Sequence, residues 1–583
     1  MLLIKANTSL DIEGVLSADG LIARSFSGYE FRPQQVQMAR AIKDAFADRR
    51  HLAAEAGTGI GKSFAYLTPA IELAHRQKTK VLISTFTITL QEQLINKDIP
   101  FLAESLPQTF TAVLAKGRGN YLCKRRLEFA MRRQATMFDC LGSTLAVINQ
   151  WANQTKDGSL SDIPVLPKNH IWDVVKSEHG NCRGRKCPHF GRCFYWRARR
   201  ELDNADIIVA NHALMFSDLV LKAQGASILP DYKYVIIDEA HNVEHVAEDH
   251  FGINISNFTV KFLLDALYNP RTHRGLLAYM DAHKAIDIVA LVGRESRKFF
   301  SRVNKWFEQT KDETSGKCYK NFVEDNLTGH LKNLHAELTA LTKICKDVDE
   351  KFEIVRLIDR CSGLVADLNS FLSQQQDDFI YWVEPSFTAG GATRLRSAPL
   401  NVGPNVKSCL FDKYESVILT SATLSCGPAS DQKAGFEFFT GRIGLDDCKM
   451  IKLGSPFDYA KQVILYIEKD LPAPNDPVFI DSAADAICKY VQKTQGRAFV
   501  LFTSYEMLDT IARKCANSFA ENGIRLLQQG AEFDRTTLLK VFKSEESAVL
   551  FGTDSFWQGV DVPGQALSNV IIVRLPFAVP DQP

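Results

Sequence analysis

The clearest hydrophobic run in the chain is Tyr234-Val235-Ile236-Ile237, which ends in the acidic pair Asp238-Glu239. A strand that is buried on both faces of a parallel sheet reads as a continuous apolar, β-branched run of this kind. The pattern therefore predicts a buried parallel strand here. Its two carboxylates would stand at the carboxyl end of that strand, where α/β sheets bind their ligands.

A different periodicity marks the middle of the chain, between about residues 248 and 400. From Leu331 to Val355, apolar residues recur at 331, 334, 338, 341, 345, 348, 352 and 355. This alternation of three and four predicts a helical stripe suited to coiled-coil-like packing. The polar run Gln374–Asp378 ends it, and we expect a helical insert that packs on itself.

Composition adds limits but no function. A chain of 583 residues is longer than one hydrophobic core usually covers, which predicts about four domains. The net charge is +1, no signal peptide is visible, and no apolar run approaches the roughly 20 residues that span a bilayer. These features predict a soluble cytoplasmic protein, in which the 13 cysteines are not expected to form a disulfide framework.

A glycine-rich segment fits the phosphate-binding P-loop pattern, with alanine in place of the first glycine. Its backbone N–H groups would point at phosphate oxygens, Lys62 would reach the β- and γ-phosphates, and the Ser63 hydroxyl would bind Mg²⁺. By itself the segment could also be an ordinary glycine-rich turn. The predicted phosphate-binding residues are Ala56, Gly57, Thr58, Gly59, Ile60, Gly61, Lys62 and Ser63.

The acidic pair supplies the other half of such a site. Asp238 would hold Mg²⁺, directly or through water, and Glu239 would orient and deprotonate the attacking water. The sequence Asp-Glu-Ala-His at 238–241 could begin a helix, but it follows an apolar strand and accompanies a P-loop. We therefore predict ATP hydrolysis, with Lys62, Asp238 and Glu239 as the catalytic residues.

Three cysteines lie in the basic stretch NCRGRKCPHFGRCFYWRARR at 181–200, and a fourth precedes it in KGRGNYLC at 116–123. Their spacing differs from the paired Cys-x2-Cys of zinc knuckles and leaves zinc, an iron–sulfur cluster and unliganded core cysteines open. The surrounding cations could contact phosphates and the aromatic side chains could stack on bases, although packing inside the domain explains the aromatics equally well. The predicted metal ligands are Cys123, Cys182, Cys187 and Cys193, the cations are Arg183, Arg185, Lys186, Arg192, Arg197, Arg199 and Arg200, and the aromatics are Phe194, Tyr195 and Trp196.

Several motifs occur in the order found in superfamily 2 helicases. The DEAH sequence resembles motif II, and the others are Arg32–Gln35 (Q-type motif), Ser84–Thr87 with Leu90 and Gln93 (motif Ia), Leu419–Leu424 (motif III), Leu501–Ser504 (motif IV) and Thr553–Asp561 (motif V). With KGRGNYLC, the cysteine spacing and ADIIVANH at 205–212, they make the chain resemble XPD/DinG-like iron–sulfur helicases. The resemblance covers essentially the whole chain.

This resemblance implies an α/β fold with two RecA-like P-loop motor domains, the second incomplete, and two domains inserted in the first. The cofactors would be ATP, Mg²⁺ and a [4Fe–4S] cluster, with Gln35 reading adenine and Gln558 and Asp561 linking the nucleotide to the second motor domain. The expected parts are motor domain 1 at 1–110, 201–247 and 401–445, the iron–sulfur domain at 111–200, the helical Arch domain at 248–400, and motor domain 2 at 446–583.

The implied activity is ATP-dependent 5′–3′ translocation on single-stranded DNA, with unwinding of duplex or forked DNA in repair or in rescue of stalled replication. A nucleoid-associated, monomeric motor is expected, with the chi subunit of DNA polymerase III as a replisome partner. Motif VI, which carries the arginine finger in this family, is not found before Pro583, and Arg574 lies in an apolar strand and is not assigned that role. A motor without the finger would hydrolyse ATP slowly, because such fingers contribute about 10³–10⁵ in rate.

Two other functions are compatible with the sequence. One is a DNA-binding clamp whose ATPase gates release without displacing a strand, which stays open for a chain without motif VI but not for one that carries it. The other is a helicase-nuclease, which the roughly 30 residues before the Q-type motif leave no room for.

Overall fold

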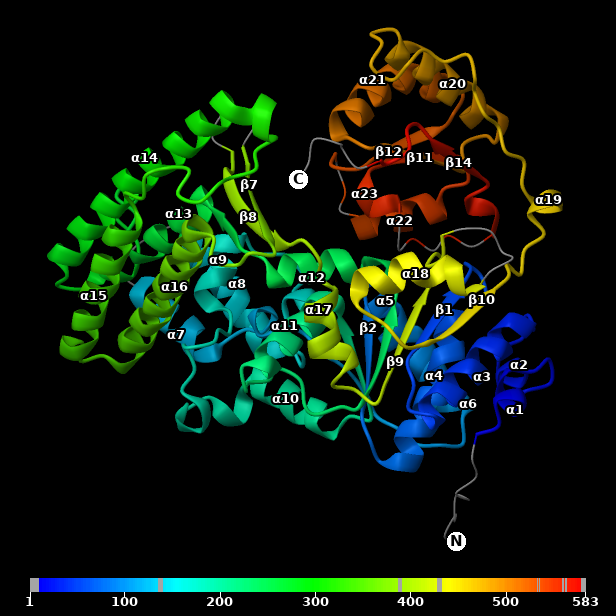
Figure 1. The fold of residues 1–583 in the computed structure, drawn as a ribbon, viewed down its shortest axis with the longest axis horizontal. Coiled ribbons are helices and arrows are strands. Elements are labelled where there is room, and N and C mark those ends of the chain that lie inside the picture. The colour runs from blue at the N-terminus through cyan, green and yellow to red at the C-terminus, as the bar shows by residue number, and fades with distance from the viewer. Residues whose placement is uncertain are drawn as a thin grey trace. The chain divides into compact units, whose positions relative to one another are not determined.

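The computed structural model describes residues 10–134, 140–385, 391–426, 432–531, 533, 535–557, 560, 562 and 564–577. The chain divides into two compact units between Pro456 and Phe457. Figure 1 shows the elements of both, and each unit is described by itself.

The first unit is built on a seven-stranded sheet in the order β10-β1-β9-β5-β2-β4-β3. All neighbouring strands are parallel. The predicted strand at Tyr234 is β5, whose five residues are all buried between β9 and β2, so this prediction is confirmed. The strands are β1 (Leu52–Ala56), β2 (Val81–Thr85), β3 (Ala112–Leu114), β4 (Ile207–Asn211), β5 (Tyr234–Asp238), β9 (Ser416–Ser421) and β10 (Lys449–Leu453).

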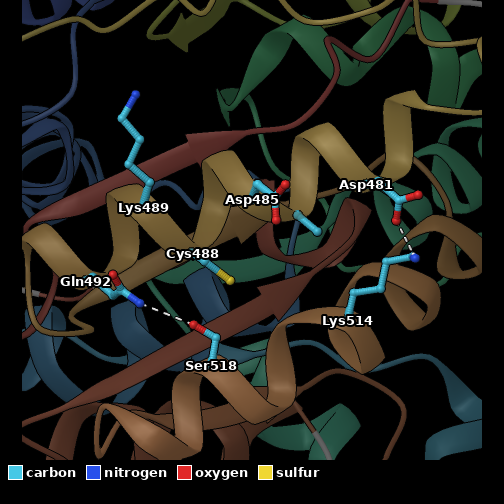
Figure 2. Close-up of a pocket in the computed structure, with 8 residues that line it drawn as sticks. Asp481, Asp485, Cys488, Lys489, Gln492, Lys514 and Ser518 are labelled. Carbon is cyan, nitrogen blue, oxygen red and sulfur yellow. Dashed lines mark hydrogen bonds and ion pairs between the residues drawn. The ribbon is translucent and has the colours of Figure 1, made fainter.

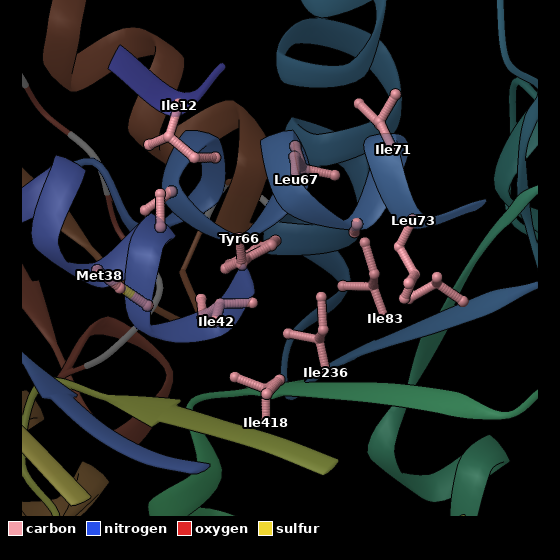
Figure 3. Close-up of a cluster of buried hydrophobic side chains, with 14 of the residues drawn as sticks. Ile12, Met38, Ile42, Tyr66, Leu67, Ile71, Leu73, Ile83, Ile236 and Ile418 are labelled. Atoms are coloured by element: carbon pink, nitrogen blue, oxygen red, sulfur yellow. The ribbon is translucent and has the colours of Figure 1, made fainter. Parts of the chain in front are cut away.

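Helices cover both faces of this sheet. On one face, Ile42 of α3 and Tyr66 and Leu67 of α4 pack over Ile83 and Ile236 of the strands (Figure 3). This face carries α1 (Ile12–Leu16), α2 (Leu21–Ser25), α3 (Pro33–Ala47), α4 (Lys62–Gln77) and α6 (Ile99–Ser105), and the other carries α11 (His212–Ala223), α12 (Val243–Phe251), α17 (Gly403–Val406) and α18 (Gln432–Ile443). The short helix α5 (Ile88–Gln93) follows β2. The burial of both faces explains the continuous apolar runs of the strands.

The first unit continues beyond the predicted boundary at residue 446. β10 pairs with β1 from Leu52↔Lys449 to Ala56↔Leu453, so it is the edge strand of the first sheet. Its sequence, KMIKL, gives no sign of which sheet it joins, because only pairing with β1 decides that. The division between the two units falls within the segment Gly454–Phe457, shortly after β10.

The cysteine-containing insert leaves the sheet after β3 and returns at β4. It consists of α7 (Lys124–Gln134), α8 (Cys140–Gln154), α9 (Asn169–Val175) and α10 (Phe194–Asn204) with connecting loops. A small core of its own surrounds Trp151, Trp172 and Ile148. An insert of this size with few apolar side chains gains from an additional cross-link.

The second insert lies between α12 and β9 and contains long helices, as predicted. They are α13 (Asn257–Leu267), α14 (His283–Thr314), α15 (Thr328–Ile344) and α16 (Val348–Ser373), with an antiparallel sheet of β6 (Asn254–Ser256), β8 (Arg394–Pro399) and β7 (Phe379–Glu384). Helices α14, α15 and α16 pack side by side (Figure 1).

The apolar stripe from Leu331 to Val355 does not belong to one helix. The chain turns between Ile344 and Val348, and Asp347 caps α16 by accepting the N–H groups of Asp349 and Glu350. Because α15 and α16 pack against each other, each keeps an apolar stripe, and the spacing of three and four continues through the turn.

The second unit has a smaller parallel sheet in the order β12-β13-β11-β14. Its elements are α19 (Tyr459–Gln462), α20 (Phe479–Lys493), β11 (Ala498–Leu501), α21 (Tyr505–Glu521), β12 (Arg525–Gln528), α22 (Arg535–Ser544), β13 (Ala548–Gly552), α23 (Asp554–Trp557) and β14 (Asn569–Ile572). An open hollow of about 410 Å³ lies between α20 and α21, bordered by the Asp481–Lys514 ion pair and by Cys488 (Figure 2). It contains none of the predicted site residues.

None of the described helices has the length and apolar character needed to cross a membrane.

Candidate functional site

The glycine-rich segment forms the turn from β1 into α4, as its pattern predicts. Gly59 and Gly61 both have φ of +84°, a left-handed conformation that favours glycine. α4 begins at Lys62, directly after Gly61. The free N–H groups and positive dipole end of this helix therefore face the position where a P-loop holds phosphate.

Gln35 forms a hydrogen bond to the glycine-rich loop. Its side chain is buried, and its Nε2 donates to the carbonyl of Gly61 at 2.9 Å while its Oε1 accepts from the Tyr29 hydroxyl at 2.7 Å. A Cβ on Gly61 would stand 2.2 Å from the same Nε2. The side-chain amide of Gln35 is thus hydrogen-bonded to the phosphate loop. Adenine recognition by Gln35 stays a prediction.

The P-loop lysine and the acidic pair lie at the same edge of the sheet. Lys62 Nζ is 3.4 Å from the carbonyl of Ala56 and 3.8 Å from Glu239 Oε1. β1 and β5 are separated in the sheet by β9 alone, and parallel strands present their carboxyl ends together. The strand order therefore brings together residues that are more than 170 positions apart in the chain.

Asp238 is a buried carboxylate with few partners. It is 4% exposed, and burial, together with the charge of Glu239, raises its pKa to about 6, which Lys62 only partly offsets. The hydroxyl of Tyr66 contacts both Asp238, at 3.2 Å, and Ser63. Sequence reasoning missed Tyr66, because a tyrosine within an apolar helix resembles any other core residue. The predicted Mg²⁺ ligands Ser63 and Asp238 thus both contact the Tyr66 hydroxyl. Oxygen donors such as a hydroxyl and a carboxylate suit Mg²⁺.

Glu239 has φ of +56°, which is uncommon for a residue with a side chain. Its N–H donates to Asp238 Oδ1 at 3.0 Å. This conformation turns the chain sharply at the end of β5 and leaves the Glu239 side chain 24% exposed next to Lys62. Strained backbone of this type is concentrated at functional sites.

Motif III contacts motif II directly. β9 lies beside β5 with Thr420 opposite Asp238. The Ser421 hydroxyl is 2.7 Å from His241 Nδ1 and donates to Glu239 Oε2 at 3.5 Å. A displacement of the loop after β9 would therefore move the side chain predicted to activate water.

Motif Ia is joined to the start of α11. Ser84 Oγ is 2.7 Å from Nδ1 of His212, which belongs to the quoted segment ADIIVANH. Burial lowers the pKa of His212 to about 4, so this ring is neutral near pH 7. Next to them, Phe86 is partly exposed and Ile88 is 65% exposed, and Thr87 caps α5 by accepting the N–H of Leu90.

The four predicted cysteine ligands gather in one region of the first insert. Burial raises the pKa of Cys193, and the nearby Cys123, Cys182 and Cys187 raise it further. Burial likewise raises the pKa of Cys123. No group of three or more His, Cys, Asp or Glu side chains in the described residues is arranged to hold a single metal ion.

Backbone N–H groups point at three of these sulfur atoms. The N–H of Gly184 lies 3.4 Å from Cys182 Sγ. Cys123 and Cys193 accept from the N–H groups of Arg126 and Trp196, respectively. Hydrogen bonds of this kind stabilise thiolate ligands and tune the potential of iron–sulfur clusters.

The aromatic side chains after Cys193 have different environments. Phe194 is buried in the core of the insert, so packing explains this side chain and the stacking role predicted for it is wrong. Tyr195 lies under the Arg118 guanidinium at 4.3 Å, and Trp196 packs on Phe190 at 5.6 Å. Both are partly exposed, so a contact with a base stays a prediction for these two.

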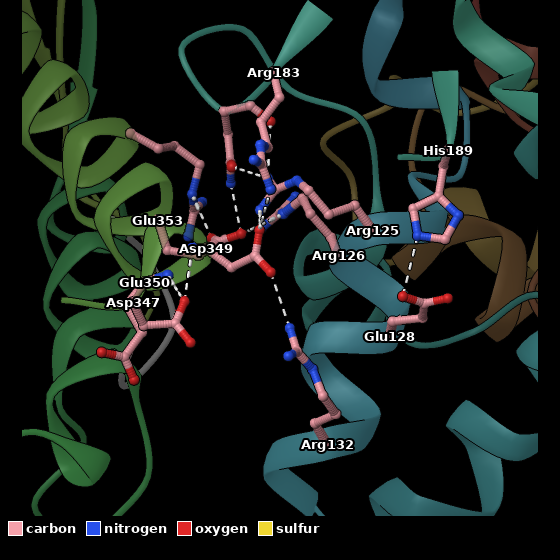
Figure 4. A network of polar contacts seen from close by, with 12 residues as sticks. Arg125, Arg126, Glu128, Arg132, Arg183, His189, Asp347, Asp349, Glu350 and Glu353 are labelled. Atoms are coloured by element: carbon pink, nitrogen blue, oxygen red, sulfur yellow. Dashed lines mark hydrogen bonds and ion pairs between the residues drawn. The ribbon is translucent and has the colours of Figure 1, made fainter. Parts of the chain in front are cut away.

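A network of buried charges joins the cysteine insert to the helical insert (Figure 4). Arg126 of α7, which is 1% exposed, pairs with Glu353 of α16 at 2.8 and 3.2 Å. Asn181 Nδ2 donates to the same carboxylate at 2.6 Å, and Arg125 pairs with Asp349 at 2.8 Å. Since Arg125 and Arg126 follow Cys123 and Asn181 precedes Cys182, the segments that carry two predicted ligands are anchored on α16.

The predicted second-domain residues Gln558 and Asp561 lie outside the described residues. In motif IV, the Ser504 side chain caps α21 by accepting the N–H of Met507.

Comparison with known proteins agrees with this geometry. Residues 168–260 match the DEAD_2 family and residues 487–583 match a helicase C-terminal domain. The ATP-dependent DNA helicase YoaA of Escherichia coli is 32% identical over 97% of this chain and 85% of its own length. The ATP-dependent helicase DinG of Mycobacterium tuberculosis is 30% identical over 96% of this chain and 84% of its own length.

A solved XPD helicase structure covers 94% of this chain and 86% of its own, with a TM-score of 0.53 and 15% identity, which supports the RecA-like motor fold. The chain belongs to the DinG/YoaA family of ATP-dependent DNA helicases.

Proposed function

We propose that this protein is a 5′–3′ DNA helicase that hydrolyses ATP at the edge of the first sheet while it translocates on single-stranded DNA and unwinds duplex or forked DNA. The observation that supports the proposal best is the meeting of the P-loop, the acidic pair and motif III at the carboxyl ends of β1, β5 and β9. The polarity rests on the family resemblance.

In the hydrolytic step, the loop N–H groups and Lys62 bind the β- and γ-phosphates. Ser63 and Asp238 would hold Mg²⁺, which would supply positive charge to neutralise the phosphates. Asp238 fits this role, because a cation offsets the charge that burial otherwise disfavours. Glu239 orients the attacking water and accepts its proton, and His241 and Ser421 hold the Glu239 side chain in place.

We further propose that Cys123, Cys182, Cys187 and Cys193 hold a [4Fe–4S] cluster, which would cross-link the loops of the insert when bound. The donor set is all thiol, the other three side chains lie within electrostatic reach of Cys193, and backbone N–H groups face three of the sulfurs. An all-thiol donor set can hold zinc or an iron–sulfur cluster, and the family resemblance favours the cluster.

The exposed cations of the insert, Arg185, Lys186, Arg192 and Arg200, then contact DNA phosphates where the strands separate. The helical insert acts as the Arch domain that encloses one strand. Basic side chains at this position would give salt-dependent, sequence-independent binding. The proposed role is DNA repair or rescue of stalled replication in the cytoplasm at the nucleoid. A replisome accessory such as the chi subunit of DNA polymerase III remains a proposal that the resemblance alone supports.

Strand displacement on matched forks tests this function. Wild-type protein should release the labelled strand from a duplex with a 5′ single-stranded tail and leave its 3′-tailed counterpart annealed, with ATP and Mg²⁺ present. Lys62→Ala should displace neither. ATP-dependent binding of the fork without release of a strand would instead identify the clamp, and preferential release from the 3′ tail would contradict the polarity.

A further inference from the structure

One carboxylate beneath the P-loop has no role in the hydrolytic step described above. Glu55 is the penultimate residue of β1, directly before Ala56 where the phosphate loop begins. In the sheet it lies between Ser421 of β9 on one side and Lys452 of β10 on the other. It therefore borders the phosphate loop, motif III and the last strand of the first unit.

The Glu55 carboxylate is bound from two directions. Its Oε2 accepts the N–H groups of Leu424, at 2.7 Å, and Ser425, at 2.6 Å. Its Oε1 lies 3.3 Å from Lys452 Nζ, which also donates to the Ser425 hydroxyl at 2.8 Å. The side chain is only 11% exposed. Burial disfavours the charged form, but these donors outweigh it and lower the pKa, so Glu55 is a carboxylate near neutral pH.

These contacts connect three segments of the first unit. The loop held by Glu55 follows Ser421, which contacts His241 and Glu239. β10, held through Lys452, ends at Leu453, three residues before the chain passes into the second unit at Pro456. The side chain of Glu55 thus links the base of the phosphate loop to the motif III loop and to β10.

We propose that Glu55 is a positioning residue that couples the phosphate site to the motif III loop and to β10, and so sets how strongly DNA stimulates ATP hydrolysis. It acts through the segments it holds, the loop after β9 and β10. The inference rests on the proposed function, since it requires DNA-stimulated hydrolysis at this site.

Two substitutions separate the contacts of Glu55. Glu55→Gln keeps an oxygen for Leu424 and Ser425 but loses the attraction to Lys452, whereas Glu55→Ala loses both. Lys452→Met should behave like Glu55→Gln, because it removes the same ion pair. Glu415→Ala is the matched control, since this carboxylate contacts Lys233, Arg49 and the Tyr234 hydroxyl at the other end of β9, away from the loop.

Three quantities are measured on the full chain: the Kd for a fluorescent ATP analogue, the ratio of kcat with and without single-stranded DNA, and amide exchange of residues 421–426. Glu55→Ala should lower the kcat ratio about tenfold and speed exchange at Leu424 and Ser425, because coupling residues contribute about 0.5–2 kcal/mol. Its Kd should stay within about twofold of wild type. Glu55→Gln and Lys452→Met should lower the ratio about two- to threefold.

Equal kcat ratios in Glu55→Ala and Glu415→Ala would overturn the inference, as would a Glu55→Ala protein that no longer binds the analogue. The first result would assign Glu55 a purely structural part, and the second would place it in nucleotide binding. A wild-type protein whose hydrolysis ignores DNA would overturn the proposed function along with the inference, whereas a failure confined to the Glu55 series would overturn the inference alone.

Discussion

Two carboxylates of the first unit are buried to the same degree, and yet their pKa values shift in opposite directions. Asp238, at the phosphate site, is 4% exposed, and Glu353, between the two inserts, is 5% exposed. Burial raises the pKa of Asp238 to about 6. At Glu353 burial also opposes ionisation, but Arg126 and Arg356 outweigh it and lower the pKa to about 2.

The difference lies in the partners. Asp238 receives one tyrosine hydroxyl and one backbone N–H, and its neighbour Glu239 carries like charge. Glu353 accepts two guanidinium bonds from Arg126 and one amide bond from Asn181. A buried carboxylate with few hydrogen-bond donors is available to bind a cation. A buried carboxylate that is paired with guanidinium groups holds the segments around it together. Asp238, at the proposed phosphate site, is thus less well paired than Glu353 at the interface between the inserts.

Asp238→Asn should separate activity from stability most sharply. Loss of the Mg²⁺ ligand should lower ATP hydrolysis about 10²-fold or more. Removal of a poorly paired buried charge should leave Tm unchanged or raise it. Steady-state hydrolysis and thermal unfolding measured on the same preparation check both parts. A variant with wild-type hydrolysis would show that Asp238 does not hold the metal.

Glu353→Ala should do the reverse, because it leaves Arg126 buried without its partner. We expect the free energy of unfolding to fall by about 3–5 kcal/mol, measured by urea denaturation. Glu308→Ala is the control, since this residue forms an exposed pair with Lys311 and should cost at most about 1 kcal/mol. Equal losses in the two variants would remove the distinction between the buried network and an ordinary surface pair.

The same carboxylate predicts a pH dependence. The Glu353 pKa is about 2 in the folded chain and 4.5 as its ordinary value, so its contribution is fully present above about pH 4.5. That contribution is lost as the pH falls toward about 2. The stability difference between wild type and Glu353→Gln should therefore shrink across this interval, as followed by urea denaturation at each pH. A difference that stays constant would mean that the pKa is not lowered by folding.

The smallest expected effect is that of Tyr66→Phe. It removes the hydroxyl that contacts Ser63 and Asp238 and leaves the ring in the core. A loss of about 1 kcal/mol, or roughly fivefold in ATP hydrolysis, is expected at saturating Mg²⁺. Tyr319→Phe, at a side chain that is 61% exposed, serves as the control and should match wild type.

Sequence reasoning succeeded where chemistry and conformation are local. The P-loop turn needs glycine at φ of +84°, and a strand buried on both faces needs an apolar run, so the loop into α4 and the strand β5 could both be predicted. The packed helices of the second insert followed from their periodicity in the same way. The meeting of the motifs at one edge of the sheet followed from parallel strand order.

The rest depends on partners far away in the chain. Nothing near Lys449 shows that β10 pairs with β1, and nothing near Arg126 shows that it meets Glu353, 227 residues later. The apolar spacing does not predict the turn at Asp347, because the spacing continues through it. In the sequence, Phe194 lies among basic residues, as a side chain that stacks on a base would. Only the folded core of the insert shows that Phe194 is buried.

The most direct test of the account is the metal content of anaerobically purified protein. It shows whether a metal cluster cross-links the loops of the cysteine insert, whose segments near Cys123 and Cys182 contact α16. We predict four iron and four acid-labile sulfide ions per chain, lost in Cys187→Ser, as a [4Fe–4S] cluster requires. Zinc without sulfide in protein kept from oxygen would contradict the account. The ATPase motor would stand, but the cluster, the 5′–3′ polarity and the strand-separating role of the insert would be withdrawn.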